Sequence, residues 1–503
     1  MSMQRRFRRT AAPLLLVTLS VVSSLTGQPK SLTILHTNDM HASFMPHEAL
    51  WVRSVVKPMI GGFVELAFAA DSIRKSAGPV LMLDAGDVMT GNPITERVYR
   101  DASGGGLFAM MNMIGYDAWC PGNHDFDLSQ ANLRALAAIA RFPAVCANVV
   151  NDRNEYPVGN RPWVVIERGG LRIGVIGLMS QELYSLVNQN NLTGIRVLAP
   201  AATLQRFIDE LDPQTDLLIA LTHEGAREDS LLATEVHGLD IIVGGHSHTR
   251  LAKPKFVNGV IIVQTGSNAE NLGELKITAE NDRVTAYEGK LIPLWAGVKR
   301  APSAIAALAD SFQGEIDKEY NEVIATLTEG WTRADGQSGV GTFLAEAQRT
   351  GAGADVGFMN NYGIRRDVPA GPLTKKALFE VLPFRNILTT FQLSGKELRA
   401  VMEYNIRKRP AIQIAGMCGR WKAGPDGAPL FVSIQVGGKP LDEGAMYRCA
   451  ASDYFVGEAL RYLGVEVRQP VFLQQTVFAA IEKAVRAAGT LSARVLYTIE
   501  RAD

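Results

Sequence analysis

Residues 32–41 read Leu-Thr-Ile-Leu-His-Thr-Asn-Asp-Met-His, and this stretch decides the fold because a short apolar run in it turns abruptly polar. Short apolar runs bounded by polar or turn-forming residues are typical of buried strands. Similar runs recur at 80–83, 144–146, 171–177, 216–221 and 240–243. Stretches with helical character lie between them, at 62–75, 128–140 and 201–211. Strands that alternate with helices predict an α/β layered domain whose sheet is largely buried on both faces.

Five polar clusters follow apolar runs of this kind. They are His36-Thr-Asn-Asp39, Asp84-Ala-Gly-Asp87, Pro121-Gly-Asn-His-Asp125, Thr222-His-Glu-Gly225 and Gly244-Gly-His-Ser-His248. Ligands of open α/β sheets collect just beyond the carboxyl ends of the strands. We therefore expect the five clusters to converge on one site.

The clusters combine imidazole, carboxylate and amide groups, which suit divalent Zn, Mn or Fe rather than thiolate-seeking metals. They hold more donors than one tetrahedral site takes. We therefore expect two divalent ions that share a bridging carboxylate. Two ions about 3.5–4 Å apart are the usual arrangement for displacement at phosphorus.

The ordered set Asp-x-His, Gly-Asp, Gly-Asn-His-Asp, Thr-His-x-Gly and Gly-His-x-His resembles the calcineurin-like metallophosphoesterase family. The longer strings LTILHTNDMHAS, DAGDVMTGNP, PGNHDFD, LTHEG and GGHSHT look like its secreted 5′-nucleotidase branch. The resemblance spans nearly the whole chain after residue 27 and is strongest in the N-terminal half. It implies an α/β fold in which a layered metallophosphoesterase β-sandwich flanked by helices is followed by a smaller α+β substrate-specificity domain.

Transferred position by position, the resemblance implies that Asp87 bridges the two metals. One metal would be held by Asp39, His41 and His248, and the other by Asn123, His223 and His246. His124 would be the catalytic imidazole, oriented or charge-stabilised by Asp127, and a metal-activated water would be the nucleophile. Two divalent ions against two carboxylates leave a local surplus near +2, which suits a phosphoryl dianion.

Three histidines stay outside this assignment. We expect His36, on the first strand, to be a core residue or to support a ligand rather than to be a ligand itself. His47 lies in a loop near the site and could contact substrate. His237 precedes a glycine at a predicted helix end, where an imidazolium meets the negative pole of the helix dipole, so we interpret it as structural.

The chain is expected to divide into a metallophosphoesterase domain at 30–297, a connector helix at 298–320 and a substrate-binding domain at 321–503. The family's Asn-Gly-Gly-Gly-Ile-Arg string is similar to residues 360–365. This implies that Asn360 and Arg365 bind substrate, and related strings imply that Phe384 and Tyr454 stack on a nucleobase. The chain departs from the family at Asn361, Tyr362 and Arg385, which stand where glycines are usual, so the leaving group stays open.

Residues 1–27 have the pattern of a cleaved signal peptide: four arginines, then an apolar stretch of 12 residues and a small, polar exit. A membrane anchor is the alternative, although a span needs about 20 apolar residues. Removing four of the 51 basic residues leaves 47 against 51 acidic ones, a net charge of −4. We expect an exported, periplasmic or secreted protein without stable membrane insertion. The two pairs of nearby cysteines, Cys120 with Cys146 and Cys418 with Cys449, could form disulfides or remain buried thiols.

Charge balance argues against a nucleic-acid binder held by phosphate neutralisation, and the sequence carries no signal for an oligomeric state. The leading hypothesis is an exported phosphoesterase with two metal ions that hydrolyses nucleotides, including nucleotide sugars or cyclic nucleotides. The alternatives are the same hydrolase acting on a non-nucleotide phosphate ester or a sulfur substrate, a DNA-repair nuclease, and a non-catalytic nucleotide-binding protein.

Overall fold

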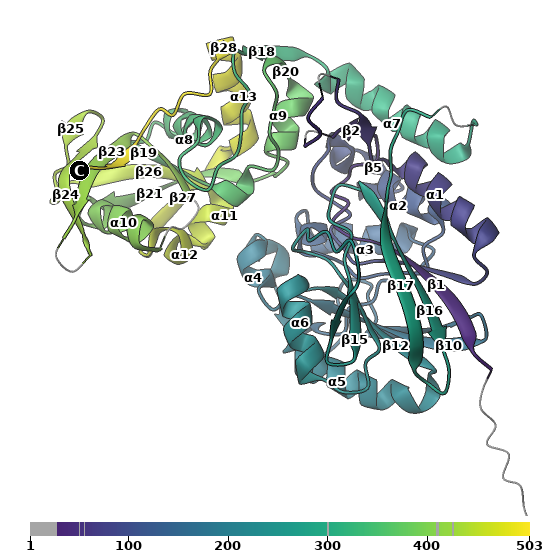
Figure 1. Cartoon of the computed structure of the whole chain (residues 1–503). Coiled ribbons are helices and arrows are strands. Elements are labelled where there is room, and N and C mark those ends of the chain that lie inside the picture. Colours follow the sequence, from purple (N-terminus) through teal and green to yellow (C-terminus); the bar gives the residue numbers. More distant parts are fainter. Residues whose placement is uncertain are drawn as a thin grey trace, which may run out of the picture.

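The computed structural model describes residues 28–49, 51–54, 56–298, 301–408, 412–424 and 427–502. The predicted signal peptide at 1–27 lies outside these ranges. Two units stand side by side, the first drawn from purple to teal and the second from green to yellow (Figure 1). Among the described helices, none combines the length and apolar character needed to cross a bilayer.

Among the described residues, two large sheets packed face to face form the core of the first unit. The first sheet has the order β17-β16-β1-β4-β7, with bounds Val284–Pro293, Asn271–Ala279, Lys30–Thr37, Val80–Asp84 and Ala118–Trp119. The second has the order β14-β15-β13-β12-β10-β9, with bounds Lys255–Val257, Val260–Val263, Ile241–Gly244, Leu217–His223, Leu171–Met179 and Trp163–Arg168. Strands β1, β4 and β7 run parallel, as do β10, β12, β13 and β15, so their carboxyl ends share an edge in each sheet.

The alternation of side chains along β1 explains the layers. Leu32 and Ile34 point between the sheets, where they join a core that includes Ile173 and Ile219 of the second sheet. Leu35 points the other way, toward the helices. The first sheet is covered by α1 (Phe63–Ser76), α2 (Gly105–Ile114), α3 (Gln130–Ile139) and α7 (Ala304–Tyr320). The second sheet is covered by α5 (Pro200–Leu211) and α6 (Ala226–Glu235). The predicted β-sandwich flanked by helices is confirmed.

One predicted strand of the first unit is wrong. Residues 144–146 form only isolated bridges, Trp119 with Ala144 and Val145 with Arg161. The apolar side chains there are buried, and the backbone pairs with a single residue on each side, Trp119 and Arg161, instead of with a strand. Shorter elements complete the unit: β2 (His47–Glu48), β3 (Met59–Ile60), β5 (Val98–Tyr99), β6 (Ala102–Ser103), β8 (Val149–Asn151), β11 (Ile195–Val197), α4 (Leu183–Leu186) and the 3-10 helices η1 (Pro93–Glu96), η2 (Asn123–Phe126), η3 (Gln189–Leu192) and η4 (Asp212–Gln214).

Helix α7 links the two units and packs on the first. Its buried residues Ile305, Phe312 and Ile316 belong to the same apolar cluster as α1 and α2. Ser303 caps it, because the side chain accepts a hydrogen bond from the backbone N–H of Ala306. The helices approach closely at Gly106 of α2, where a Cβ atom would lie 2.4 Å from the Phe312 ring.

Three sheets with helices packed against them form the second unit. Their orders are β20-β18-β28, β22-β19-β26-β21-β27 and β25-β24-β23-β29. The strands are β18 (Val323–Leu327), β19 (Val356–Asn360), β20 (Gly371–Thr374), β21 (Ile387–Ser394), β22 (Ile412–Ala415), β23 (Met417–Ala423), β24 (Pro429–Val436), β25 (Lys439–Pro440), β26 (Met446–Ser452), β27 (Arg468–Thr476), β28 (Thr490–Leu491) and β29 (Ile499–Arg501). The helices are α8 (Gly339–Gly351), η5 (Asn361–Gly363), α9 (Lys375–Val381), α10 (Gly395–Lys408), α11 (Asp453–Gly457), α12 (Ala459–Leu463) and α13 (Val477–Ala488).

His36 on β1 is buried, as expected of a core residue, and its Nδ1 has no hydrogen-bond partner. Burial lowers the pKa of this imidazole from 6.5 to about 3. Below pH 6.5 this imidazole is therefore protonated in the unfolded chain but stays neutral in the folded protein. The free energy of unfolding consequently falls as the pH drops from 6.5 toward 3.

We expect wild type to lose about 2 kcal/mol of unfolding free energy between about pH 7 and about pH 5 through this group. His36→Gln cannot titrate and should lack that loss. Urea unfolding of both proteins at the two pH values measures the difference, with the exposed His237→Gln as the matched control. Equal acid sensitivity in wild type and His36→Gln would contradict the prediction.

Candidate active site

The predicted metal ligands stand on strained backbone at the strand ends. Five of them have positive φ angles: Asp39 (50°), His41 (46°), Asp87 (55°), His246 (75°) and His248 (53°). L-residues rarely adopt this left-handed region, and such strain concentrates at functional sites. The turns that follow the strands thereby point these side chains to one place.

Asp39, His41 and His248 form one cluster of possible metal ligands. Nε2 of His41 lies 2.9 Å from Nε2 of His248, and that nitrogen lies 3.4 Å from Oδ1 of Asp39. Nδ1 of His41 faces the Thr90 carbonyl oxygen at 3.1 Å, which leaves Nε2 for a metal. Oδ1 of Asp39 is buried and accepts no hydrogen bond.

Asp87, His223 and His246 form a second cluster. Oδ2 of Asp87 lies 3.2 Å from Nε2 of His223 and 3.9 Å from Nε2 of His41, so this carboxylate stands between the two clusters. Nδ1 of His223 faces the carbonyl oxygen of Ala85 at 2.6 Å, which again leaves Nε2 as the ligand atom. The side-chain oxygen of Asn123 is buried without a partner.

This arrangement fits divalent cations. Unpartnered buried oxygens and facing imidazole nitrogens are costly unless a cation lies among them. Burial by itself lowers the pKa of His223, but the charges of Asp87 and Asp39 outweigh it and raise that pKa to about 10. The site therefore attracts positive charge strongly enough to hold a proton where a metal would bind.

Gly122 and Gly245 let the strand-end loops come this close. A Cβ atom on Gly122 would lie 2.3 Å from Oδ1 of Asp87, and one on Gly245 would lie 2.6 Å from the Ala85 carbonyl oxygen. Any larger residue would therefore push the loops apart.

His124 and Asp127 form the predicted pair. Nδ1 of His124 lies 2.6 Å from Oδ2 of Asp127, which leaves Nε2 as the other ring nitrogen, and His124 lines the cavity. Burial alone would lower the pKa of His124, but the charges of Asp127 and Asp87 and the hydrogen bond to Asp127 raise it above the ordinary value. His124 is thus held in a form that can donate a proton.

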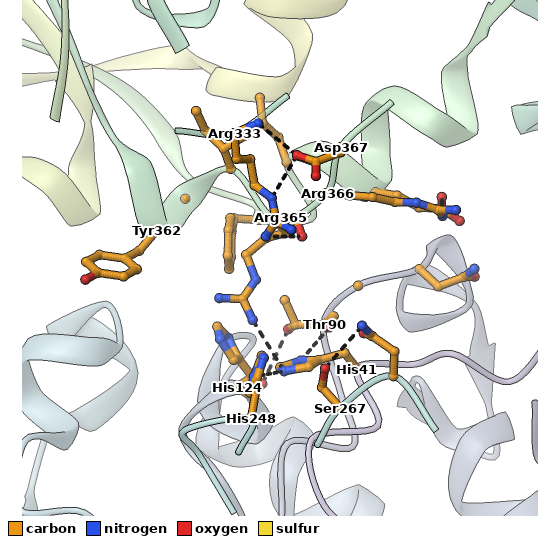
Figure 2. A pocket seen from close by; sticks show the side chains of 18 of the residues that line it. His41, Thr90, His124, His248, Ser267, Arg333, Tyr362, Arg365, Arg366 and Asp367 are labelled. Carbon is orange, nitrogen blue, oxygen red and sulfur yellow. Dashed lines mark hydrogen bonds and ion pairs between the residues drawn. The ribbon is translucent and has the colours of Figure 1, made fainter. Parts of the chain in front are cut away.

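The second domain reaches into this site (Figure 2). Nη2 of Arg365 lies 3.3 Å from Nε2 of His41. The Phe384 ring lies 5.7 Å from the His124 ring, centroid to centroid. The Tyr454 hydroxyl donates to the Ser185 carbonyl oxygen of the first domain at 2.7 Å, and Asn360 is buried.

One cavity of about 1340 Å³ lies between the domains and collects these groups. Ten predicted site residues line it: His41, Asp87, Asn123, His124, His246, His248, Asn360, Arg365, Phe384 and Tyr454. Asp39, His223 and Asp127 lie behind this wall and contact residues that form it. His47 also lines the cavity, 3.4 Å from a carboxylate oxygen of Glu270, whereas His237 is exposed elsewhere.

Family comparisons agree with both halves of this site. The family model described as calcineurin-like phosphoesterase matches residues 32–250, and the model described as 5′-nucleotidase, C-terminal domain matches residues 323–462. The chain is therefore similar to the 5′-nucleotidase family in both halves. It is accordingly a metal-dependent phosphoester hydrolase, and the family implies divalent metal ions at the two clusters.

Individual members of the 5′-nucleotidase family align over most of their length. Silent protein UshA(0) of Salmonella typhimurium is 29% identical over 494 residues, which covers 84% of each chain. A 5′-nucleotidase of Vibrio cholerae is 28% identical over 478 residues, which covers 83% of each. The solved 5′-nucleotidase precursor of Thermus thermophilus has a TM-score of 0.81 at 26% identity and covers 94% of this chain and 100% of its own.

Two supporting residues of the 5′-nucleotidase site were missed by sequence reasoning. Asn38 donates to Oδ2 of Asp39 at 2.6 Å and fixes the carboxylate so that Oδ1 faces the cluster. Asp125 accepts from the backbone N–H groups of Asp87, Met89 and Gly122, and so ties two ligand loops together. Both residues lie inside the sequence motifs, directly beside predicted site residues, and this position is the signal that could have identified them.

The structure also shows where the residues that depart from the family pattern lie. Arg385 turns away from Phe384 and donates to Glu96 of the first domain at 3.1 Å, so its charge is neutralised there. The Asn361 amide donates to the Ala334 carbonyl oxygen at 2.8 Å, and Tyr362 is 69% exposed at the cavity. The four cysteines, all within the described ranges, form no disulfide.

Proposed function

We propose that the protein hydrolyses nucleotides, releasing nucleoside and phosphate, outside the cytoplasm. One observation carries this proposal: two side chains of the second domain reach the metal clusters. Nη2 of Arg365 lies 3.3 Å from Nε2 of His41, and the Phe384 ring centroid lies 5.7 Å from that of His124. A phosphate placed at the metal clusters would therefore meet a guanidinium. The organic group attached to it would meet an aromatic ring.

We assign the ligands of two divalent ions, Zn, Mn or Fe, from this geometry. Asp87 stands between the clusters and would bridge, while the remaining ligands divide into two sets: Asp39, His41 and His248; and Asn123, His223 and His246. When bound, such ions lower the pKa of a coordinated water and polarise the phosphoryl oxygens.

The protein's own groups complete the chemistry. Arg365 offers forked donors to the phosphoryl oxygens and positions them against the clusters. His124, oriented by Asp127, stabilises charge on those oxygens or protonates the leaving oxygen from Nε2. Phe384 and Tyr454 would stack on the base, and Asn360 would contact the nucleoside or the phosphate.

Export rests on the sequence of residues 1–27, whose basic and apolar segments have the pattern of a cleaved signal peptide. Expression of the full chain, followed by fractionation and N-terminal sequencing of the mature protein, tests this. A protein retained in the cytoplasm with its N-terminus intact would refute export.

The substrate proposal is tested with the metal-loaded protein on nucleoside monophosphates, nucleotide sugars, cyclic nucleotides and a generic aryl phosphate. We expect turnover of at least one nucleotide class, with kcat/KM well above that for the aryl phosphate. Turnover of the aryl phosphate alone would refute the nucleotide substrate while leaving the phosphoesterase intact.

Arg365→Ala should raise KM for the nucleotide by about ten- to a hundred-fold, because a charge-assisted hydrogen bond to phosphate is worth about 1.5–3 kcal/mol. Arg365→Lys should recover part of the loss. The neighbouring Arg366 pairs with Glu380 instead, so Arg366→Ala is the matched control. Steady-state kinetics decide, and equal KM values for the two alanine variants would contradict the assignment.

A further inference from the structure

Thr90 adopts a backbone conformation that its side chain disfavours. It follows the Asp84–Asp87 motif and has φ of 63°, in the left-handed region. For a β-branched residue this is a genuine outlier, and glycine would occupy it without strain. Thr90 is also only 5% exposed, at the wall of the cavity. A strained, buried threonine at an active site needs a reason in its side chain.

The Thr90 hydroxyl supplies that reason. Oγ1 donates to Oδ2 of Asp127 at 2.7 Å, and the same oxygen lies 2.6 Å from Nδ1 of His124. The backbone carbonyl of Thr90 accepts from Nδ1 of the ligand His41 at 3.1 Å. Figure 2 shows Thr90 beside His41, with His124 nearby. One residue therefore contacts both the predicted proton donor pair and a metal ligand.

We propose that Thr90 is a positioning residue for hydrolysis, acting on His124 through Asp127. The inference rests on the proposed role of His124. Two donors on one carboxylate oxygen fix the rotation of Asp127, and Asp127 in turn fixes the His124 ring with Nε2 toward the cavity. Without the hydroxyl the carboxylate can rotate, and the imidazole loses its fixed direction.

A purely structural role makes different predictions. If Thr90 only shapes the loop, the near-isosteric Thr90→Val should be tolerated, and Thr90→Gly should relieve strain without harming activity. If the hydroxyl acts through Asp127, both variants should lose activity alike, because both lose the same hydrogen bond. Thr90→Ser keeps the hydroxyl and should recover most of the activity.

The experiment measures kcat, KM, bound metal and unfolding free energy for the metal-loaded full chain. Thr90→Val and Thr90→Gly should each lower kcat about ten-fold with KM and metal content within two-fold of wild type, as expected for one lost hydrogen bond to a charged group. Thr90→Gly should be at least as stable as wild type. Thr95→Val, which removes a buried threonine hydroxyl bonded to the Asn92 carbonyl oxygen in the neighbouring 3-10 helix η1, is the matched control and should keep wild-type kcat.

A double-mutant cycle identifies the path of the effect. In an Asp127→Asn background, Thr90→Val should change kcat less than two-fold further. A full ten-fold additional loss in that background, or wild-type kcat in Thr90→Gly, would overturn the inference. His124→Ala separates this result from the larger proposal. If that variant keeps wild-type kcat, the proposed function of His124 fails. If it is inactive, but the effects of Thr90→Val and Asp127→Asn on kcat are additive, only the role of Thr90 is refuted.

Discussion

Replacing His124 with alanine is expected to lower kcat by about 10²–10⁴-fold, the usual contribution of a positioned acid–base group. The reason is that Asp127, 2.6 Å from Nδ1, already orients the imidazole and leaves Nε2 as the ring nitrogen that can serve the substrate. His124 is not needed in either assigned ligand set, so bound metal should stay at the wild-type level. Steady-state kinetics together with metal analysis of the purified variant measure both quantities.

His237→Ala is the matched control for this prediction, because His237 is exposed and lies outside the cavity. It should keep wild-type kcat. A His124→Ala variant with normal kcat would refute the catalytic assignment. A variant that loses metal along with activity would instead make His124 a ligand, as its contact with His41 and Asp87 in a third possible cluster allows.

Asp87→Asn is expected to lower kcat/KM by about a thousand-fold or more, roughly 4 kcal/mol. Asp87 is the carboxylate between the two clusters, 3.2 Å from His223 and 3.9 Å from His41, and its Oδ1 accepts from the backbone N–H of His124 at 2.8 Å. The amide keeps the shape but removes one of the two ligand charges. We expect bound metal to fall by at least one ion per chain.

Metal content and activity are measured together for Asp87→Asn, and added metal in excess should restore activity only partly. The control is Asp152→Asn, whose carboxylate is 82% exposed near Arg196. Full metal content with full activity in Asp87→Asn would contradict a bridging role.

The sequence predicted the clusters of possible metal ligands because each of these residues lies at or shortly after the end of a strand, where topology alone brings it to the shared edge. The support around the ligands could not be predicted in the same way. Asn38 accepts hydrogen bonds from Thr265, 227 positions later in the chain, and no local pattern announces that contact. The failed strand at 144–146 has the same origin, since burial there comes from neighbours rather than from a paired ladder.

Placement of the second domain was also beyond the sequence. The motifs named Arg365 and Phe384, but only the packing of the two units brings them to His41 and His124. Arg385 shows the limit most clearly: it stands beside Phe384 in sequence, whereas its side chain donates to Glu96 in the other domain.

The left-handed backbone at Asp39, His41, Asp87, His246 and His248 has an evolutionary consequence. Each position costs the fold about 1–2 kcal/mol, which a glycine would return. Selection for hydrolysis therefore works against selection for stability at these five codons. Once hydrolysis is no longer required, glycine at one of these positions would remove its backbone strain together with a proposed metal ligand.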